Sequence, residues 1–272
     1  MATLNTVTSS TRPASPTAGE AYFETDTNKI VVYNGTTWTE IVSDGTLGSY
    51  SNAYSVDLDG TNDYIDLGTS STLNPTSALT ISAWVYINGA GTGSLPTIYS
   101  SSKNSAGSMG GIALAYASNK IRFYLDETGS SSWVFAESNS TMNTSQWYHL
   151  AGTWNGSTVT LYVNGTAQTT TGSATTIGYN TDFPATIGRY TSNYFQGLID
   201  EVAFFNSALS ASDITTMYNS GVPTDITSLS PVGWWRMGDN DSGTGTTITD
   251  QGSGSNDGTL TNSPTFSSSV PS

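Results

Sequence analysis

Acidic side chains are the first residues in this sequence that could do chemistry, because a pair of carboxylates can hydrolyse a glycosidic bond. The six glutamates are scattered along the chain: Glu20, Glu24, Glu40, Glu127, Glu137 and Glu201. Only Asp126-Glu127 and Asp200-Glu201 place a glutamate beside another acid. Adjacent residues of a strand point to opposite faces, so neither doublet predicts a dyad about 5 Å apart. The sole histidine, His149, lies inside the apolar stretch WYHLAGTW, which argues against a serine triad. We therefore expect no catalytic residues and no enzymatic activity.

Aromatic side chains are the second group with a chemical use. The chain has 7 Trp and 15 Tyr, and carbohydrate recognition combines an aromatic platform with hydrogen-bonding groups. Most of the tryptophans lie in predicted strands, where packing is their expected role. Trp133 lies in the turn-rich stretch GSSSWVFAES, and Tyr190 and Tyr194 lie in the loop GRYTSNYFQG. We expect these three side chains to be exposed and name them as candidate carbohydrate-binding residues.

Charge excludes two classes of partner. The chain has 7 Lys+Arg against 21 Asp+Glu, a formal net charge of -14, which repels phosphate backbones and anionic lipid head groups. We expect no nucleic-acid partner, and no segment is long and apolar enough to insert into a bilayer. The N-terminus lacks the features of a secretory signal. Without cysteine, stability must come from packing, metal binding or oligomerisation.

The elements that must position these residues are strands. Charged residues make up only 10% of the chain, and the Gly-, Ser- and Asn-rich remainder favours turns and strand edges. Residues 79–87 alternate aliphatic with polar or aromatic side chains, and residues 159–163 repeat this alternation. This pattern predicts an all-β sandwich of two antiparallel sheets. Further strands are expected at 55–58, 64–67, 111–116, 120–125, 147–154, 195–205 and 232–237. One short helix is expected from Ser210 to Asn219, with Ser210 as its N-cap.

Residues 1–45 form a first region. Residues 1–20 are polar and contain Pro13 and Pro16, which predicts an extended arm that becomes ordered against a partner. Three short apolar runs separated by turns follow and predict a small β-meander. From Arg12 to Trp38, the pattern R-P-x-x-P-x-x-G-x-x-Y-F-x-T-x-T-x-K-x-x-V-Y-N-G-x-x-W resembles short modules at the N-termini of phage tail and head-fibre proteins. This resemblance implies attachment to other virion proteins and formation of a homo-oligomer, with a trimer as the commonest fibre arrangement.

Residues 46–272 form the second region and resemble a known family. The stretches SVDLDGTNDYIDLG, LTISAWVYI, WYHLAGTWNGSTVTLYVNG and IGRYTSNYFQGLIDEVAFFNSALSASDITTMYNSG occur in this order over residues 55–221. Together they resemble the laminin-G-like, concanavalin-A-like jelly-roll domains. The resemblance implies a two-sheet sandwich that often binds sugar and often holds a structural Ca2+. We expect the C-terminal stretch 226–272 to return into the same sandwich.

The family resemblance also implies a place for calcium. The aspartate of a G-x-I-D-E-V strand commonly holds the ion in related domains, and here it is Asp200 in GLIDEV. The turn from Asp59 to Asp63 offers further oxygens, so Asp59 and Asp63 are candidate co-ligands. The alternative is that Asp200 caps a strand end through hydrogen bonds. A second acidic loop, from Asp239 to Asp250, lacks the central glycine of a calcium loop and is interpreted as a polar turn.

These observations favour a bacteriophage surface protein, either a head-decoration protein or a fibre subunit, that displays a carbohydrate-binding domain toward host-surface glycans. The virion surface is its expected location. Two alternatives remain: a structural capsid cement protein that binds no glycan, and a glycan-degrading enzyme on the same fold.

Overall fold

The protein consists of two units. The computed structural model describes residues 5–25, 29–41, 50–103, 109–128, 133–179 and 183–272. Its contacts divide the chain into Met1–Ser51 and Asn52–Ser272, and each unit is described separately below. The predicted boundary between residues 45 and 46 lies outside the described residues. Within the described part of the chain, no helix combines the length and apolar character needed to cross a membrane.

The first unit is a small mixed sheet in the order β1-β2-β3-β4. Its strands are β1 (Asn5–Val7), β2 (Ala21–Glu24), β3 (Lys29–Tyr33) and β4 (Trp38–Ile41). The last three form the predicted antiparallel meander, in which Trp38 packs against the rings of Tyr22 and Tyr33. The expectation of an extended arm over residues 1–20 is wrong for its described part. Residues 5–7 pair in parallel with β2, and Arg12 forms an ion pair with the buried Glu24.

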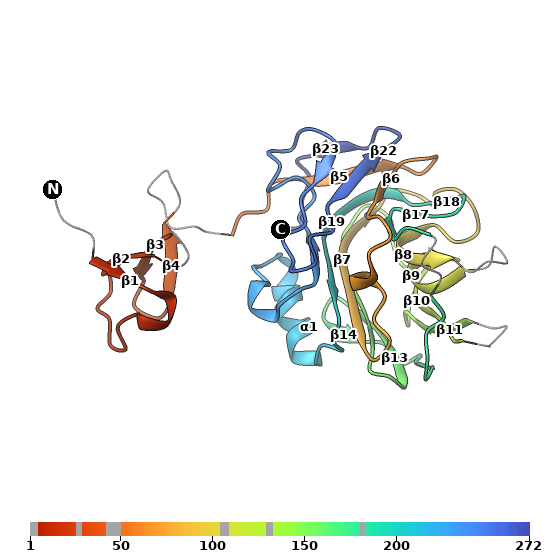
Figure 1. The fold of residues 1–272 in the computed structure, drawn as a ribbon. Helices are drawn as coiled ribbons and strands as arrows, with labels where there is room; N and C mark the ends of the chain where they lie inside the picture. The colour runs from red at the N-terminus through yellow and green to blue at the C-terminus, as the bar shows by residue number, and fades with distance from the viewer. Residues whose placement is uncertain (1–4, 26–28, 42–49, 104–108, 129–132, 180–182) are drawn as a thin grey trace. The chain divides into compact units, whose positions relative to one another are not determined.

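The second unit contains the two large sheets of a jelly-roll sandwich, as predicted (Figure 1). The eight-stranded sheet has the order β11-β10-β9-β8-β16-β6-β22-β21. In chain order its strands are β6 (Tyr64–Asp66), β8 (Thr97–Lys103), β9 (Met109–Ala117), β10 (Lys120–Asp126), β11 (Trp133–Glu137), β16 (Thr186–Ile187), β21 (Thr247–Ile248) and β22 (Gly258–Thr261). A short hairpin, β17 (Arg189–Tyr190) and β18 (Asn193–Tyr194), follows β16.

The nine-stranded sheet forms the other layer, with the path β14-β13-β12-β7-β19-β5-β23. These strands are β5 (Ser55–Asp59), β7 (Leu79–Ile87), β12 (Trp147–Trp154), β13 (Thr158–Val163), β14 (Thr166–Ala167), β19 (Gln196–Phe205) and β23 (Thr265–Ser267). Two further strands, β15 (Gly172–Ser173) and β20 (Gly233–Trp235), pair with β13 and β19. The sequence did not predict β8 and β11, because their Ser- and aromatic-containing stretches lack clear alternation.

The core lies between the two sheets and follows from the period of two along each strand. On β7 the aliphatic side chains from Leu79 to Ile87 face inward and are buried. On β10, Ile121, Phe123 and Leu125 face them from the other sheet. Gly152 on β12 lies against the Phe123 ring, where an added Cβ would come within 2.3 Å of a ring carbon. The glycine therefore allows the two sheets to approach closely.

The outer face of the nine-stranded sheet is covered by α1 (Ala211–Tyr218) and the chain that follows it (Figure 1). The Ser210 side chain caps the helix by accepting a hydrogen bond from the Asp213 N–H, and Asn219 ends it in the left-handed conformation. Tyr218 stacks on the ring of Trp84, which belongs to the outer face of β7. The described part of the second unit also has three 3-10 turns: η2 (Ser71–Leu73), η3 (Asn219–Gly221) and η4 (Thr227–Leu229). A further one, η1 (Ser9–Thr11), belongs to the first unit.

The C-terminal stretch takes part in both layers. β20 pairs with β19, β21 and β22 extend the eight-stranded sheet beyond β6, and β23 forms the edge of the nine-stranded sheet beside β5. Trp235 is fully buried, and its indole N–H donates to the carbonyl of Asn256. The last strands of the chain therefore close the sandwich beside its first strands.

Candidate functional site

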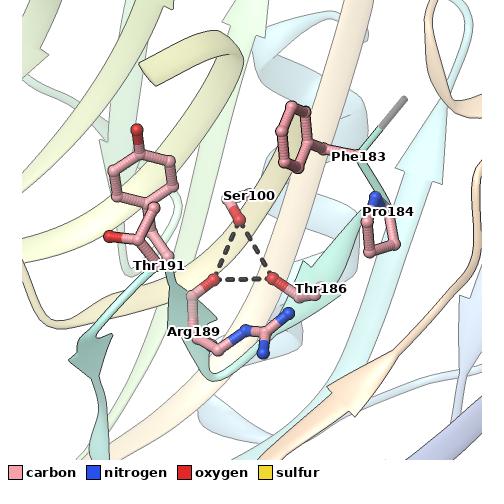
Figure 2. A pocket seen from close by; sticks show the side chains of 7 residues that line it. Ser100, Phe183, Pro184, Thr186, Arg189 and Thr191 are labelled. Carbon is pink, nitrogen blue, oxygen red and sulfur yellow. Dashed lines mark hydrogen bonds between the residues drawn. The ribbon is translucent and has the colours of Figure 1, made fainter. Parts of the chain in front are cut away.

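A pocket lies on the outer face of the eight-stranded sheet, the face that α1 does not cover. Its volume is about 220 Å³. Ser100 of β8 and Thr186 of β16 are directly paired across the two strands, and their side chains point away from the core because Tyr99 and Ile187 beside them point into it. The other lining residues follow β16 or precede it: Phe183, Pro184, Arg189, Tyr190 and Thr191. Figure 2 shows these side chains around the opening.

Three polar groups form a closed triangle at the base of the pocket (Figure 2). The hydroxyls of Ser100 and Thr186 lie 3.0 Å apart, and both donate to the carbonyl oxygen of Arg189, at 2.8 Å and 2.6 Å. Because the triangle uses both hydroxyl hydrogens internally, the lone pairs left for the pocket can only accept. The base of the pocket therefore suits a ligand that offers O–H or N–H donors.

Tyr190 supplies a second polar group, and its placement corrects the prediction that it is exposed. The side chain is only 8% exposed, and it packs with Ala113, Ala115 and Tyr124 of the sheet below it. Its hydroxyl is buried without a hydrogen-bond partner among the described residues. Burial raises the pKa of Tyr190 to about 12, with a smaller contribution from the charge of Asp126. The hydroxyl therefore stays protonated and carries a hydrogen-bond donor that no described residue accepts.

Arg189 forms one wall of the pocket. Its guanidinium carbon lies 3.6 Å from the centre of the Tyr64 ring, a close cation–π contact. Among the lysines and arginines whose side chains are described, Arg189 alone lacks an ion pair. Opposite it, Phe183 is 37% exposed and presents an apolar ring at the rim. The pocket combines an aromatic ring, a cation and hydroxyl groups.

The other two predicted sugar-binding residues do not line this pocket. Trp133 is half-buried on β11, where its ring meets Tyr124 edge-on. It packs beside the cluster that contains Tyr190, so it belongs to the same sheet face but lies outside the pocket. Tyr194 is half-buried on β18, in the hairpin that carries Tyr190. Ser100, Thr186 and Arg189 were missed by the sequence, because only strand pairing brings them together.

The predicted calcium ligands do not come together. Asp59 is paired with Gln196, four residues before Asp200 on β19, and four residues of strand span about 13 Å. Asp59 accepts hydrogen bonds from the N–H groups of Thr61 and Asn62, and Asp63 accepts one from the Asp59 N–H. These two carboxylates therefore stabilise their own turn, and neither is placed to share an ion with Asp200.

A bulge on β19 corrects the expectation that Asp200 and Glu201 point to opposite faces. The pairing with β7 shifts between Asp200 and Ala203, and Glu201 adopts a positive φ of 47°. Asp200 is opposite Trp84, and Glu201 lines the same small cavity as Trp84. Both acids thus lie on the outer side of the sheet, because the bulge breaks the alternation.

Both acids are buried and hydrogen-bonded. Glu201 accepts from the Trp234 indole N–H at 2.6 Å and from Arg236 Nε at 3.0 Å. Asp200 accepts from the Asn52 side-chain amide at 2.9 Å and from the Glu201 N–H at 2.8 Å. Burial raises the pKa of Asp200 well above its usual range, and the charges of Glu201 and Asp239 raise it further. This surplus of negative charge is the feature that a cation would offset.

Asp200 and Asn52 have the donor type that calcium prefers. The Asn52 side-chain carbonyl oxygen is buried, and no hydrogen-bond partner is found for it in the described part of the chain. No three Asp, Glu or His side chains among the described residues group as metal ligands. A Ca2+ ion here would be held by the Asp200 carboxylate and this Asn52 oxygen. Such an ion would have a structural role.

Ser82 and His149 form a hydrogen-bonded pair that the sequence did not predict. Ser82 Oγ lies 2.9 Å from His149 Nε2, and both residues are buried on the outer face of β7 and β12. Burial lowers the pKa of His149 to about 3, so the imidazole is neutral. His149 Nδ1 has no described partner, and the adjoining cavity of about 10 Å³ is the size of one water molecule. The pair has no space for a substrate.

A wider groove lies between α1 and the turn after β13. Its volume is about 490 Å³, and it is lined by Asn164, Gly165, Thr166, Thr215, Thr216, Tyr218, Asn219 and Ser220. The polar groups of this groove already have internal roles. Thr215 and Thr216 donate to carbonyls one turn earlier in the helix, and Asn164 accepts from the His149 N–H. The groove has no cation, and its one ring, Tyr218, is stacked on Trp84.

Comparison with protein-family models identifies the family of the chain. The model of the Laminin_G_3 family, described as the concanavalin A-like lectin/glucanases superfamily, matches residues 59–215. The match covers more than half of the chain, and the chain belongs to this family. A comparison with curated protein sequences found no match.

Among the solved structures that match, one with a TM-score above 0.5 shows the same fold, and two others are similar with lower scores. A candidate carbohydrate-binding protein from Bacteroides ovatus matches 94% of this chain and 71% of its own chain, with a TM-score of 0.63 and 16% identity. A heptameric SAP-like pentraxin from Limulus polyphemus matches 61% of this chain and 82% of its own, with a TM-score of 0.45 and 16% identity. Domain 4 of an extracellular arabinanase from Geobacillus stearothermophilus, solved with arabinotriose, matches 69% and 81%, with a TM-score of 0.44 and 18% identity.

Proposed function

We propose that this protein binds carbohydrate without cleaving it, through the pocket on the outer face of the eight-stranded sheet. The observation that carries this proposal is the set of groups in the pocket. The Ser100 and Thr186 hydroxyls can accept hydrogen bonds, the Tyr190 hydroxyl is buried without a described partner, and the Phe183 ring is partly exposed. A sugar has hydroxyls for the first two and an apolar ring face for the third.

The size of the pocket limits the contact to a small part of a glycan. At about 220 Å³ it is smaller than typical drug-binding pockets, which begin near ~300 Å³. We infer that one sugar residue occupies it and that the rest of the glycan lies across the sheet. Binding through one residue is weak, so useful affinity requires several copies of the protein acting together.

The absence of catalysis is part of the proposal. Asp200 and Glu201 adjoin each other, but both are buried and bonded to Asn52, Trp234 and Arg236. Asp126 is the carboxylate whose charge reaches Tyr190, and burial raises the pKa of this acid. None of the described residues that line the pocket is an acid, so the lining does not supply the pair of carboxylates that glycoside hydrolysis uses. Release of reducing sugar from any glycan that the protein binds would contradict this part.

The first unit is proposed to attach the protein to a bacteriophage particle. The resemblance of Arg12 to Trp38 to phage tail and head-fibre modules supports this role. In the proposed arrangement the first unit binds other virion proteins, and the sandwich is displayed on the virion surface as a homo-oligomer. A chain without residues 1–45 should fail to join particles during assembly, and its normal incorporation would contradict the proposal. If the intact chain joined particles but bound no saccharide, this result would indicate a structural cement protein that does not bind glycans.

The binding proposal is tested by a glycan array followed by calorimetric titration of the best oligosaccharide. Tyr190→Phe removes only the hydroxyl, and we expect a loss of about threefold to tenfold in affinity, the value of one hydrogen bond. Tyr194→Phe is the matched control, because Tyr194 lies on the same hairpin but outside the pocket. Its affinity should equal that of the unmodified protein. No binding to any glycan, or equal losses in both variants, would refute the proposed site.

A further inference from the structure

We infer that the pocket selects an acidic sugar, a hexuronate whose carboxylate binds Arg189. This inference rests on the proposed function and specifies its ligand class. It starts from the state of Arg189, for which the structure gives neither an ion pair nor a side-chain hydrogen bond among the described residues. The other arginines are all paired: Arg12 with Glu24, Arg122 with Glu137, and Arg236 with Glu201 and Asp239.

The excess of acidic residues in the chain makes the lack of an ion pair at Arg189 unusual. The chain has 21 acids for 7 bases, so a partner carboxylate for an arginine is easily found. Arg189 instead rests on the Tyr64 ring, which stabilises the cation but occupies none of its N–H donors. The guanidinium therefore keeps its planar set of donors, the arrangement that binds a carboxylate through two parallel hydrogen bonds.

The remaining groups of the pocket fit the rest of a uronate. The Ser100 and Thr186 hydroxyls accept hydrogen bonds from sugar hydroxyls, because their own hydrogens are directed to the Arg189 carbonyl. Arg189 therefore has two roles: its backbone carbonyl orients the Ser100 and Thr186 hydroxyls, and its side chain supplies the cation. Phe183 lies on the opposite side of the opening from Arg189 in Figure 2 and offers its ring to the apolar face of a pyranose.

Two carboxylates near the pocket define which acidic glycans can enter. Asp66 is the cross-strand partner of Thr186, and the charge of Asp126 acts on Tyr190. A densely sulfated chain would bring several negative charges against these acids. A single carboxylate directed at Arg189 avoids both. The arrangement therefore favours glycans with isolated uronic acid residues over heavily sulfated ones.

The test compares three matched oligosaccharides by calorimetric titration of the full chain. They are a uronate-containing trisaccharide, the same trisaccharide with its carboxyl reduced to an alcohol, and an O-sulfated form of the uronate trisaccharide. We expect the uronate to bind about tenfold more tightly than the reduced form and more tightly than the sulfated form. Its affinity should fall as salt rises, because one ion pair is formed.

Arg189→Gln should remove the preference, with a loss of about tenfold for the uronate and no change for the reduced trisaccharide. Arg189→Lys keeps the charge and should retain part of the preference. Arg122→Gln is the matched control, since Arg122 lies on the outer face of the same sheet, is paired with Glu137 and does not line the pocket. The melting temperature of each variant reports whether it is folded.

The outcomes separate this inference from the proposed function. Equal affinity for the uronate and its reduced form would overturn the inference and leave glycan binding intact. An equal loss of affinity for both ligands in Arg189→Gln would also overturn it, because the arginine would then act without regard to charge. If neither the trisaccharides nor any glycan on the array bound to the protein, the proposed function itself would be refuted.

Discussion

The two outer faces of the sandwich have similar polar and aromatic residues, but those residues serve different purposes. The face of the nine-stranded sheet has a serine beside a histidine, two carboxylates, an arginine and a stacked tryptophan, all covered by α1 and the chain after it. The face of the eight-stranded sheet has a serine beside a threonine, an arginine and two rings, and it opens into a cavity of about 220 Å³. On the covered face the cavity beside Ser82 and His149 is about 10 Å³. The space next to each hydrogen-bonded pair, more than the residue types, separates the structural pair from the pair that can contact a ligand.

The largest expected effect compares one tryptophan from each face. Trp84 is 3% exposed and stacks on Tyr218, so Trp84→Ala should cost about 3–5 kcal/mol of unfolding free energy. Trp133 is half-buried at the edge strand β11, and Trp133→Ala should cost clearly less. Chemical denaturation of both variants measures the difference. Equal costs would mean that the two faces are equally packed.

The second prediction concerns pH and the covered face. His149 has a folded pKa of about 3 against 6.5 in the unfolded chain, so the unfolded state takes up the proton first as pH falls. The histidine therefore lowers stability from about pH 6.5 downward, by about 1.4 kcal/mol per pH unit, until pH reaches about 3. The raised pKa of Asp200 acts in the opposite direction but is shared by wild type and variant. Denaturation of wild type and His149→Gln across this range should show a gap that changes with this slope. A constant gap would contradict the buried neutral histidine.

The third prediction compares one serine from each face. Ser82→Ala leaves His149 Nε2 without its partner in addition to Nδ1, and it should cost about 1–3 kcal/mol of stability. Ser100→Ala leaves the Arg189 carbonyl bonded to Thr186, so its cost should lie below about 1 kcal/mol. Calorimetric titration should show reduced glycan affinity in Ser100→Ala alone. A larger loss of stability in Ser100→Ala than in Ser82→Ala, or reduced glycan affinity in Ser82→Ala, would contradict the distinction between the two faces.

The last prediction tests the cation beside Asp200. If Ca2+ binds the folded state, a tenfold excess over its dissociation constant stabilises the protein by about 1.4 kcal/mol. A chelator should then lower the melting temperature of the wild type and leave Asp200→Asn unchanged. An identical response of the two proteins, or none in either, would exclude this carboxylate as a calcium ligand.

The sequence predicted what local patterns control. The alternation in residues 79–87 reports the two faces of β7, and Ser210 with Asp213 marks the start of α1 because both belong to one capping box. It could not predict the bulge at Asp200 and Glu201, because the register shift depends on pairing with β7. It singled out Tyr190 but took the side chain to be exposed, since the cluster around Ala113, Ala115 and Tyr124 forms only in three dimensions. Ser100 and Thr186 are 86 residues apart and meet through strand pairing alone.

The most direct test of the central claim is a crystal structure of the protein with a bound oligosaccharide. One sugar ring should lie between Phe183 and the Ser100–Thr186 pair, with its hydroxyls bonded to those two side chains and to the Tyr190 hydroxyl. A saccharide bound in the groove beside Tyr218 and Asn164, with the outer-face pocket left without sugar, would contradict the account.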